Sequence, residues 1–281
     1  MFVLPVAAIP IGRFRPYNAA HHRVYSQAVS PRKVSPARAG IPWYIRCVPL
    51  TDYEKYIRTD ELLSLQKAPE ALTCHDEMQF QVVHQAHELY MKLIAHELRF
   101  LCRLLEGGEL ARGVTTLHRV TGIQRVLLQS VDLLDTMAPT DYMMIRTGLG
   151  RGSGQESPGF RTMLRLPGEI VWPAVAAFLE RSQLALRQIY EAPHAHHHEF
   201  QLCEGLVDYD QMLQMWRYRH LMLVYRIIGT GTPSLKGKHS DLLAHGMKQR
   251  FFPKLWDVRD EVFANWTTAQ AEKGSETGYH G

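Results

Sequence analysis

The sequence contains few cysteines and no long hydrophobic run. Among its 281 residues there are four cysteines, at positions 47, 74, 102 and 203. They form no CxxC pair, and their wide spacing is typical neither of a disulfide framework nor of a zinc site. No stretch approaches the roughly 20 apolar residues that a membrane-spanning helix needs. We therefore expect a protein of the reducing cytoplasm without a membrane segment.

Acidic residues are absent from the start of the chain, since no Asp or Glu precedes Asp52. Residues 1–51 contain seven of the 32 Lys and Arg residues, so the remainder carries 25 basic against 28 acidic residues, a net charge of −3. The formal charge of +4 therefore comes from the first segment. A field that attracts nucleic acid should come from the folded surface, so we expect no nucleic-acid partner.

The basic segment 1–50 lacks the pattern of a secretion signal. Its apolar opening is interrupted by Pro5 and Pro10, and no basic residue precedes it. We expect this segment to be a flexible N-terminal arm. An organelle transit sequence and a start codon placed too far upstream are the alternatives.

Alternating strand patterns are missing from Leu62 onward, where long segments with helical periodicity are separated by short breaks. The sequence therefore predicts an all-α helical bundle, with a helical domain at 51–265 and a polar C-terminal tail at 266–281. The clearest predicted helices are 77–106, 111–137, 168–190, 207–229 and 240–263.

Two glycine-rich segments separate these helices. The first, 148–159, has five glycines in twelve residues, and the second is 229–237. Glycine lets backbone N–H groups approach a ligand closely, so both segments are candidate binding loops. Plain connectors between helices are the alternative.

A histidine lies within the apolar stripe of the first long helix. The stripe recurs at three- and four-residue spacing and comprises Phe80, Val83, His84, His87, Met91, Ile94 and Leu98. His84 is therefore either a core residue with one hydrogen-bonded nitrogen or a polar group at the wall of a ligand pocket. A non-heme metal site at His84, His87 and Glu88 is a further alternative, although their order is not that of the HExxH zinc motif.

A second stripe in the helix at 207–229 again includes one histidine. It comprises Leu213, Trp216, His220, Leu223, Val224 and Ile227. A buried neutral imidazole beside large apolar side chains suits an axial heme ligand, because most of the porphyrin surface is apolar. A packed core histidine is the alternative.

Tyr142 and Arg146 are four residues apart and would be neighbours on a helical turn. A guanidinium there suits a substrate carboxylate, which it grips with two parallel hydrogen bonds; a surface arginine is the alternative. The histidines at 196–198 are expected in a solvated loop, with adventitious metal binding as their chemistry.

Six segments resemble the tryptophan 2,3-dioxygenase family in the same order along the chain. They are 51–67, 75–93, 141–146, 202–208, 216–229 and 250–259. The resemblance covers about residues 51–263, and ordered motifs over that length are more specific than any single one.

The resemblance implies a helical, usually tetrameric heme b enzyme that adds O2 to the indole ring of tryptophan. By motif position, His220 is similar to the axial iron ligand and His84 to the distal histidine that accepts the indole N–H. Phe80 resembles the aromatic wall of the indole pocket, while Arg146, with Tyr142 beside it, resembles the residue that binds the substrate carboxylate. The residues matching Tyr53, Tyr56 and Ile57 come from a neighbouring subunit in the family and close the pocket.

The chain departs from the family pattern in the substrate-facing loops. The family's Ser-Gly-Phe-Gln-Ser loop reads Ser153-Gly154-Gln155-Glu156-Ser157 here, so an aromatic residue is replaced and a carboxylate enters. The family's Gly-Thr-Gly-Gly-Ser loop, which holds the substrate ammonium and carboxylate, is replaced here by Gly229-Thr-Gly-Thr-Pro-Ser234. Thr230 or Thr232 is the nearest equivalent of the threonine in that loop. The region 160–199 is shorter than in the family.

We therefore expect ring-opening dioxygenation of L-tryptophan or a substituted tryptophan to an N-formylkynurenine product. A heme-dependent monooxygenase that makes a hydroxylated or 2-oxindole product is the alternative, motivated by the changed loops. A non-catalytic heme-binding or sensing protein and a helical scaffold without a cofactor are two further hypotheses.

Overall fold

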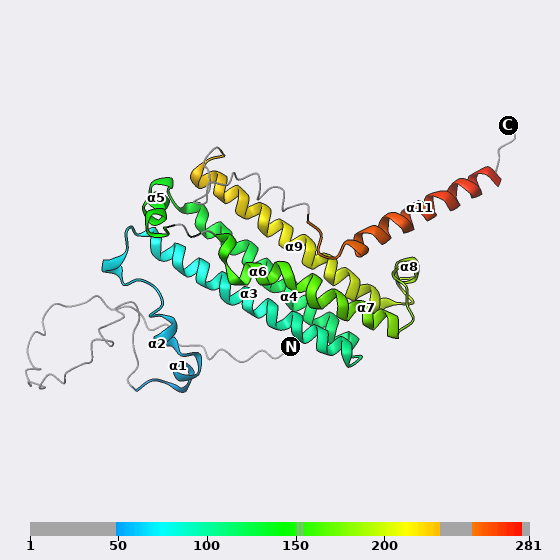
Figure 1. Ribbon diagram of the computed structural model, residues 1–281, viewed down its shortest axis with the longest axis horizontal. Coiled ribbons are helices and arrows are strands. Elements are labelled where there is room, and N and C mark those ends of the chain that lie inside the picture. The colour runs from blue at the N-terminus through cyan, green and yellow to red at the C-terminus, as the bar shows by residue number, and fades with distance from the viewer. Residues whose placement is uncertain (1–48, 151, 153, 231–248, 277–281) are drawn as a thin grey trace, which may run out of the picture. The chain divides into compact units, whose positions relative to one another are not determined.

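The computed structural model describes residues 49–150, 152, 154–230 and 249–276, with side chains described up to 268 and at 270. The chain divides into two units, Met1–Cys47 and Val48–Gly281, and the described residues all belong to the second. They contain helices and no strand, so the all-α prediction is confirmed (Figure 1). The expected N-terminal arm lies almost wholly outside the described residues.

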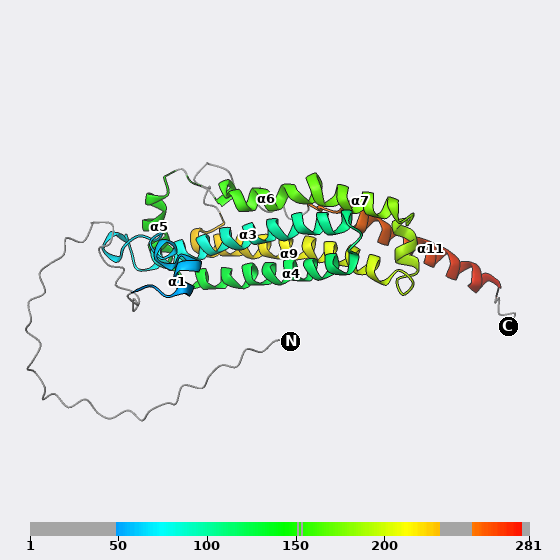
Figure 2. The same cartoon turned by 90° about the horizontal axis from the view of Figure 1, so that it is seen from below.

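Three long helices form the body of the bundle: α3 (Asp76–Glu106), α4 (Leu110–Ser130) and α9 (His197–Ile228). Helix α4 packs against both α3 and α9, and α6 (Pro158–Leu166) and α7 (Trp172–Arg181) cover the other side of α3 (Figure 2). Helices α9 and α4 approach closely at Gly205, where an added Cβ would lie 3.1 Å from Leu117 of α4.

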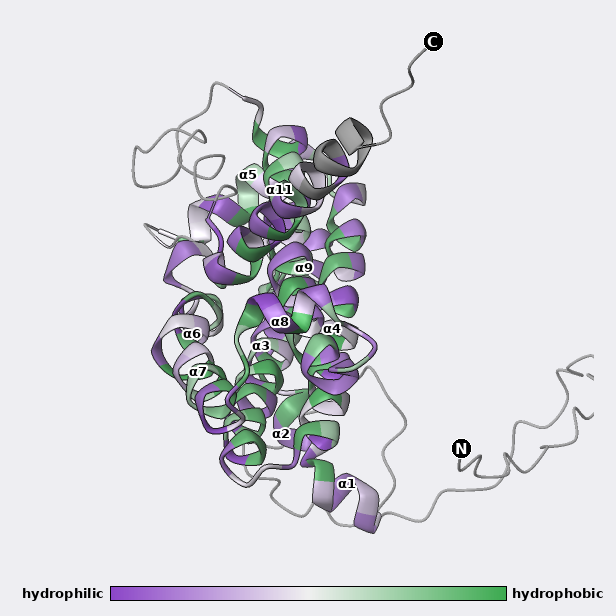
Figure 3. Ribbon diagram, turned by 90° about the vertical axis from the view of Figure 1, so that its right-hand side faces the viewer, coloured by the Kyte–Doolittle hydropathy of each residue, from purple (hydrophilic) through white to green (hydrophobic). Residues whose placement is uncertain are grey.

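The core lies between these helices because each carries a stripe of apolar residues along one face. Fully buried members of the core are Ile94, Leu98, Leu101, Leu105, Leu117, Val120, Leu202 and Leu206. Hydrophobic and hydrophilic residues alternate along the ribbons of the bundle helices, as amphipathic packing requires (Figure 3). None of the helices in the described residues is both long and apolar enough to cross a bilayer.

Short elements complete the described chain. On the N-terminal side are α1 (Asp52–Ile57), α2 (Thr59–Leu62) and a 3-10 turn at Pro69–Ala71. A 3-10 helix at Val131–Thr136 follows α4 and leads to α5 (Pro139–Gly148). A 3-10 turn at Gly154–Glu156 precedes α6, and a π-turn at Pro167–Val171 joins α6 to α7. Helix α8 (Leu186–Glu191) follows α7, and α11 (Pro253–Glu276) ends the described chain.

The predicted helix 77–106 is confirmed, but other predicted boundaries are wrong. The helix predicted at 168–190 is interrupted at 182–185, where Gln183 has a left-handed backbone with φ of 54°. The helix predicted at 111–137 tightens to a 3-10 helix after Ser130.

The predicted C-terminal boundaries also differ from the structure. Helix α9 begins ten residues before 207, so His197 and His198 lie in its first turn and not in a loop. For the helix predicted at 240–263, positions 240–248 lie outside the described residues, and α11 starts at Pro253. It continues to Glu276, past the boundary at 265 where a polar tail was expected.

Candidate active site

The structure brings the two histidine-bearing stripes together. The ring of His84 on α3 lies 4.0 Å from that of Phe80 and 6.3 Å from that of His87, between centroids. The His87 ring in turn lies 6.0 Å from the indole of Trp216 on α9. Trp216 stacks on His220 with centroids 5.6 Å apart and an interplanar angle of 14°. A continuous group of rings therefore joins the two histidines that the sequence singled out.

The hydrogen bond of His84 defines which ring nitrogen is available. Nδ1 lies 2.7 Å from the backbone oxygen of Phe80. A carbonyl oxygen only accepts, so Nδ1 carries the proton and donates it. Desolvation by burial lowers the pKa of His84, with the backbone bond and the charge of Glu88 opposing that effect. The neutral ring therefore keeps an unprotonated Nε2 that is able to accept an N–H group.

His87 is held by Ser130, the last residue of α4. Its Nε2 lies 2.6 Å from the hydroxyl of Ser130, and that hydroxyl donates to the backbone oxygen of Leu127 at 2.9 Å. Ser130 therefore joins the ring of His87 to the last turn of α4. Burial, together with the positive charge that His84 or His220 would carry, lowers the pKa of His87 to about 4.

His220 has the properties of a free imidazole ligand. Burial and the nearby His84 lower its pKa to about 4, so the ring is neutral near pH 7. It makes no hydrogen bond to any residue in the described part of the chain, and its neighbour Trp216 has a buried indole N–H that likewise lacks a partner there. An unprotonated imidazole nitrogen and an unsatisfied donor among aromatic rings fit a large, mostly apolar iron cofactor.

Helix α5 places Tyr142 beside this group of rings. The centroid of Tyr142 lies 6.3 Å from that of Phe80, and burial raises the pKa of the phenol while the charge of Arg146 opposes the rise. Arg146 lies one turn further along α5 and is partly buried. The expected helical pairing of Tyr142 and Arg146 is thus observed, next to the ring of Phe80.

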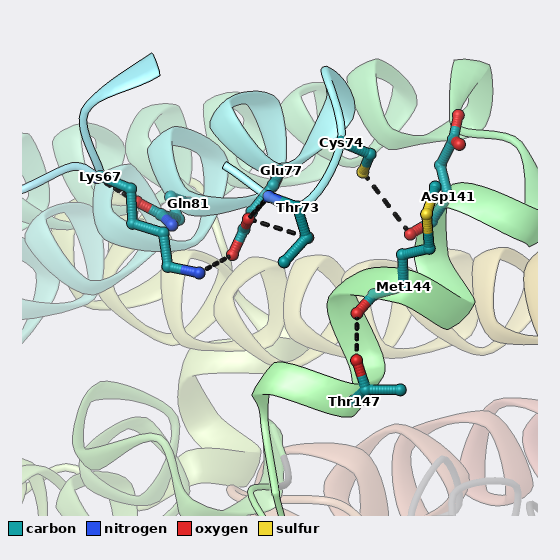
Figure 4. A network of polar contacts seen from close by, with 8 residues as sticks. All are labelled: Lys67, Thr73, Cys74, Glu77, Gln81, Asp141, Met144 and Thr147. Carbon is teal, nitrogen blue, oxygen red and sulfur yellow. Dashed lines mark hydrogen bonds and ion pairs between the residues drawn. The ribbon is translucent and has the colours of Figure 1, made fainter. Parts of the chain in front are cut away.

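The start of α3 is fixed by a polar network that also reaches α5 (Figure 4). The buried carboxylate of Glu77 accepts from Lys67 Nζ at 2.5 Å and from the backbone N and the hydroxyl of Thr73 at 2.7 and 2.9 Å. These bonds lower the pKa of Glu77 to about 2. The thiol of Cys74 lies 3.7 Å from the backbone oxygen of Asp141, the residue before Tyr142.

The remaining predicted substrate residues lie in other elements of the chain or outside the described residues. Gly154 begins the 3-10 turn before α6, Thr230 directly follows Gly229 at the end of α9, and both are exposed. Ser153 and Thr232 lie outside the described residues. Tyr53, Tyr56 and Ile57 on α1 are 70%, 87% and 41% exposed, so none of them fills a pocket of its own chain.

The alternative metal set on α3 is not assembled. Within the described ranges no group of three His, Cys, Asp or Glu side chains is placed to hold an ion. The Glu88 carboxylate instead accepts hydrogen bonds from Ser157 and from the backbone N of Gly159.

The sequence did not indicate three contacts of the site. Ser130 holds His87, Phe160 packs against Trp216, and Glu88 binds the start of α6. The Phe160 ring lies 5.5 Å from the indole of Trp216. The sequence did contain a local signal for the start of α6, because a serine directly before a proline is typical of a helix N-terminus. Ser157 caps α6 by accepting from the backbone N of Phe160 at 2.9 Å.

Comparison with known proteins gives a consistent result. Residues 49–169 match the family model described as tryptophan 2,3-dioxygenase. The chain is 32% identical to the tryptophan 2,3-dioxygenase of Myxococcus xanthus, over 75% of this chain and 90% of that protein. The corresponding enzyme of Caulobacter vibrioides is 32% identical over 75% of this chain and 98% of its own length. That of Erythrobacter litoralis is 33% identical with the same two coverages.

Proposed function

Because the chain belongs to the tryptophan 2,3-dioxygenase family, whose members are heme-dependent oxidoreductases that use O2, we propose that it oxidises the indole ring of L-tryptophan. The proposed reaction inserts both atoms of O2 across the C2–C3 bond and gives N-formylkynurenine. A tryptophan with a substituted ring is a second substrate of the same chemistry.

The observation that carries this proposal is the tautomer of His84. Its Nδ1–H is committed to the backbone oxygen of Phe80, which leaves Nε2 as an acceptor. An indole has a single polar group, its N–H donor, so this nitrogen is the one contact that fixes an indole in a pocket otherwise lined by rings. The ring of Phe80, 4.0 Å from His84 between centroids, supplies the apolar face against which the indole packs.

His220 is the residue that would hold heme b, through its neutral imidazole. When bound, the heme iron supplies the activation of O2 that the protein side chains cannot provide. Trp216 stacks on the ligand ring and limits its rotation, and the aromatic rings around it exclude water from the reacting atoms.

Arg146 would bind the carboxylate of the amino acid through two parallel hydrogen bonds, with Tyr142 beside it. This contact fixes the distance between the amino-acid end of the substrate and His84, which turns the ring toward the cofactor. Gly154 and Thr230, with Ser153 and Thr232 outside the described residues, stay predicted contacts for the ammonium and carboxylate groups.

Assembly into a homotetramer is part of the proposal. Tyr53, Tyr56 and Ile57 stand out from α1 and would cover the pocket of a neighbouring subunit. Their exposure supports this role, since three large, mostly apolar side chains on one face of a short helix are costly to leave in water. A cytoplasmic location also stays a prediction.

The alternative product is a hydroxylated or 2-oxindole derivative formed by transfer of a single oxygen atom. It is favoured by the loop at 153–157, where Gln155 replaces the aromatic residue of the family loop and Glu156 adds a carboxylate. Both side chains are exposed. The proposal is tested by supplying L-tryptophan and O2 to the heme-loaded protein and measuring product mass. Ring opening adds two oxygen atoms, whereas a gain of one atom, with a need for peroxide or a reductant, would contradict it.

A further inference from the structure

Glu88 connects the helix that carries His84 to the glycine-rich segment and to α6. It lies one turn after His84 on α3, and one of its carboxylate oxygens accepts from the hydroxyl of Ser157. The other oxygen accepts from the backbone N of Gly159 at 3.0 Å. Both partners lie at the start of α6, where unpaired backbone N–H groups and the helix dipole favour a negative charge.

The contact between α3 and α6 at this point is as close as a glycine permits. A Cβ added to Gly159 would lie 2.7 Å from Oε2 of Glu88 and 2.8 Å from Cβ of Met91, both shorter than side-chain contacts allow. The position of α6 is therefore set by direct contact with α3, and Glu88 supplies the polar part of that contact.

Two links lead from this contact to the substrate pocket. The backbone N of Ser157 donates to the backbone oxygen of Gly154 at 3.2 Å, so the residue that Glu88 holds is bonded to a predicted substrate residue. Phe160, whose backbone N donates to the hydroxyl of Ser157, places its ring against Trp216, which stacks on His220. A shift of Ser157 would therefore change both the loop and one wall of the ring cluster.

We propose that Glu88 is a positioning residue for the substrate, which holds the end of the glycine-rich segment and the first turn of α6 at a fixed distance from His84. This inference rests on the proposed function. Glu88 itself contacts neither the reacting atoms nor the cofactor in this role. Its removal should loosen the substrate-binding loop and leave His220 in place.

The test compares Glu88→Ala, Glu88→Gln and Ser157→Ala in the full heme-loaded chain. A glutamine still accepts from Gly159 and contacts Ser157, so it should restore most of the function. We expect the Kd of L-tryptophan, measured by the shift of the heme Soret band, and the KM to rise roughly tenfold in Glu88→Ala. The value of kcat should change less than about threefold, and the heme content should equal that of the parent. Ser157→Ala should give a smaller rise in the same direction and keeps the test available should Glu88→Ala fold poorly.

Glu97→Ala is the matched control. Glu97 is a buried carboxylate of the same helix, about 13 Å further along its axis, and it pairs with Arg119 of α4 at 2.8 Å. The Glu97→Ala variant should lower the free energy of unfolding without raising the KM for L-tryptophan. Hydrogen exchange at the backbone amides of residues 157, 159 and 160 gives a readout that does not require heme, and it should accelerate in Glu88→Ala but not in Glu97→Ala.

The possible failures are distinguishable. If the parent chain neither binds nor oxidises L-tryptophan, the proposed function is overturned and this inference with it. If the parent does both, but Glu88→Ala keeps the parent Kd and KM, the inference alone is overturned. An equal rise of KM in Glu97→Ala would also overturn it, because the effect would then be general destabilisation.

Discussion

The indole ring of Trp216 lies nearly parallel to the imidazole of His220, at an interplanar angle of 14° and a centroid distance of 5.6 Å. The two residues are one turn apart on α9, so the stacking follows from the helix itself. Because Trp216 is also packed against His87 and Phe160, it restrains the ring of His220 before any cofactor binds.

His220→Ala should lose stable heme binding, because it removes the neutral imidazole that would hold the iron. We expect the affinity for heme to fall by at least about tenfold. The measurement is the Soret absorbance per chain after supplementation with heme. His198→Ala, in the exposed histidine cluster at the start of α9, is the control. Full heme occupancy in His220→Ala would show that the iron ligand is another residue.

His84→Ala should bind heme normally and turn over poorly. The lost Nε2 acceptor leaves the indole N–H without its partner, and a poorly placed substrate costs roughly 10²-fold in rate. Heme content and kcat/KM for L-tryptophan measure the two effects separately. Activity close to that of the parent would contradict the role assigned to His84.

The stability of the fold should depend on pH through His87. Its pKa is about 4 in the folded chain against 6.5 for an ordinary histidine, so the unfolded chain binds the proton more readily between these values. Stability is therefore complete above about pH 6.5 and decreases as the pH falls toward 4. The free energy of unfolding, measured with urea, should fall between pH 7.5 and pH 5.5 by about 1 kcal/mol less in His87→Gln than in the parent. His96→Gln, an exposed histidine of the same helix, should behave like the parent.

Glu77 should stabilise the start of α3 through its charge. The hydrogen bonds from Lys67 and Thr73 lower its pKa to about 2 from 4.5, so the stabilisation is present above pH 4.5 and is lost as the pH falls through about 2. Glu77→Gln should lower the free energy of unfolding by about 2 kcal/mol near pH 7. This is less than the full pKa difference implies, because Lys67 is partly solvated and its charge is screened. Equal stability of this variant and of Glu70→Gln, at an exposed position nearby, would contradict the account.

The sequence predicted those features that depend only on residues close together in the chain. The bounds of α3 follow from an apolar stripe that ends at Gly107, and the pairing of Tyr142 with Arg146 follows from their four-residue spacing. The break at Gln183 was missed because neither glycine nor proline marks it. The left-handed residue ends α7, where the backbone N of Leu184 donates to the backbone oxygen of Leu179 at 3.0 Å.

The geometry of the site depends on contacts between distant segments, which periodicity does not contain. The stripes indicated that His84 and His220 lie on apolar faces, but not that His87 and Trp216 bridge them. The tautomer of His84 required the position of the Phe80 carbonyl, and the role of Glu88 required the fold of α6 onto α3. The order of the family motifs supplied the pairing of the two histidines that spacing alone left open.

The central claim is the insertion of both atoms of O2 into the indole ring. Its most direct test is a single turnover of the heme-loaded protein with L-tryptophan under ¹⁸O2, followed by mass spectrometry of the product. We predict a ring-opened product that carries two labelled oxygen atoms without an added reductant. A product with one labelled atom and an intact ring would contradict the claim.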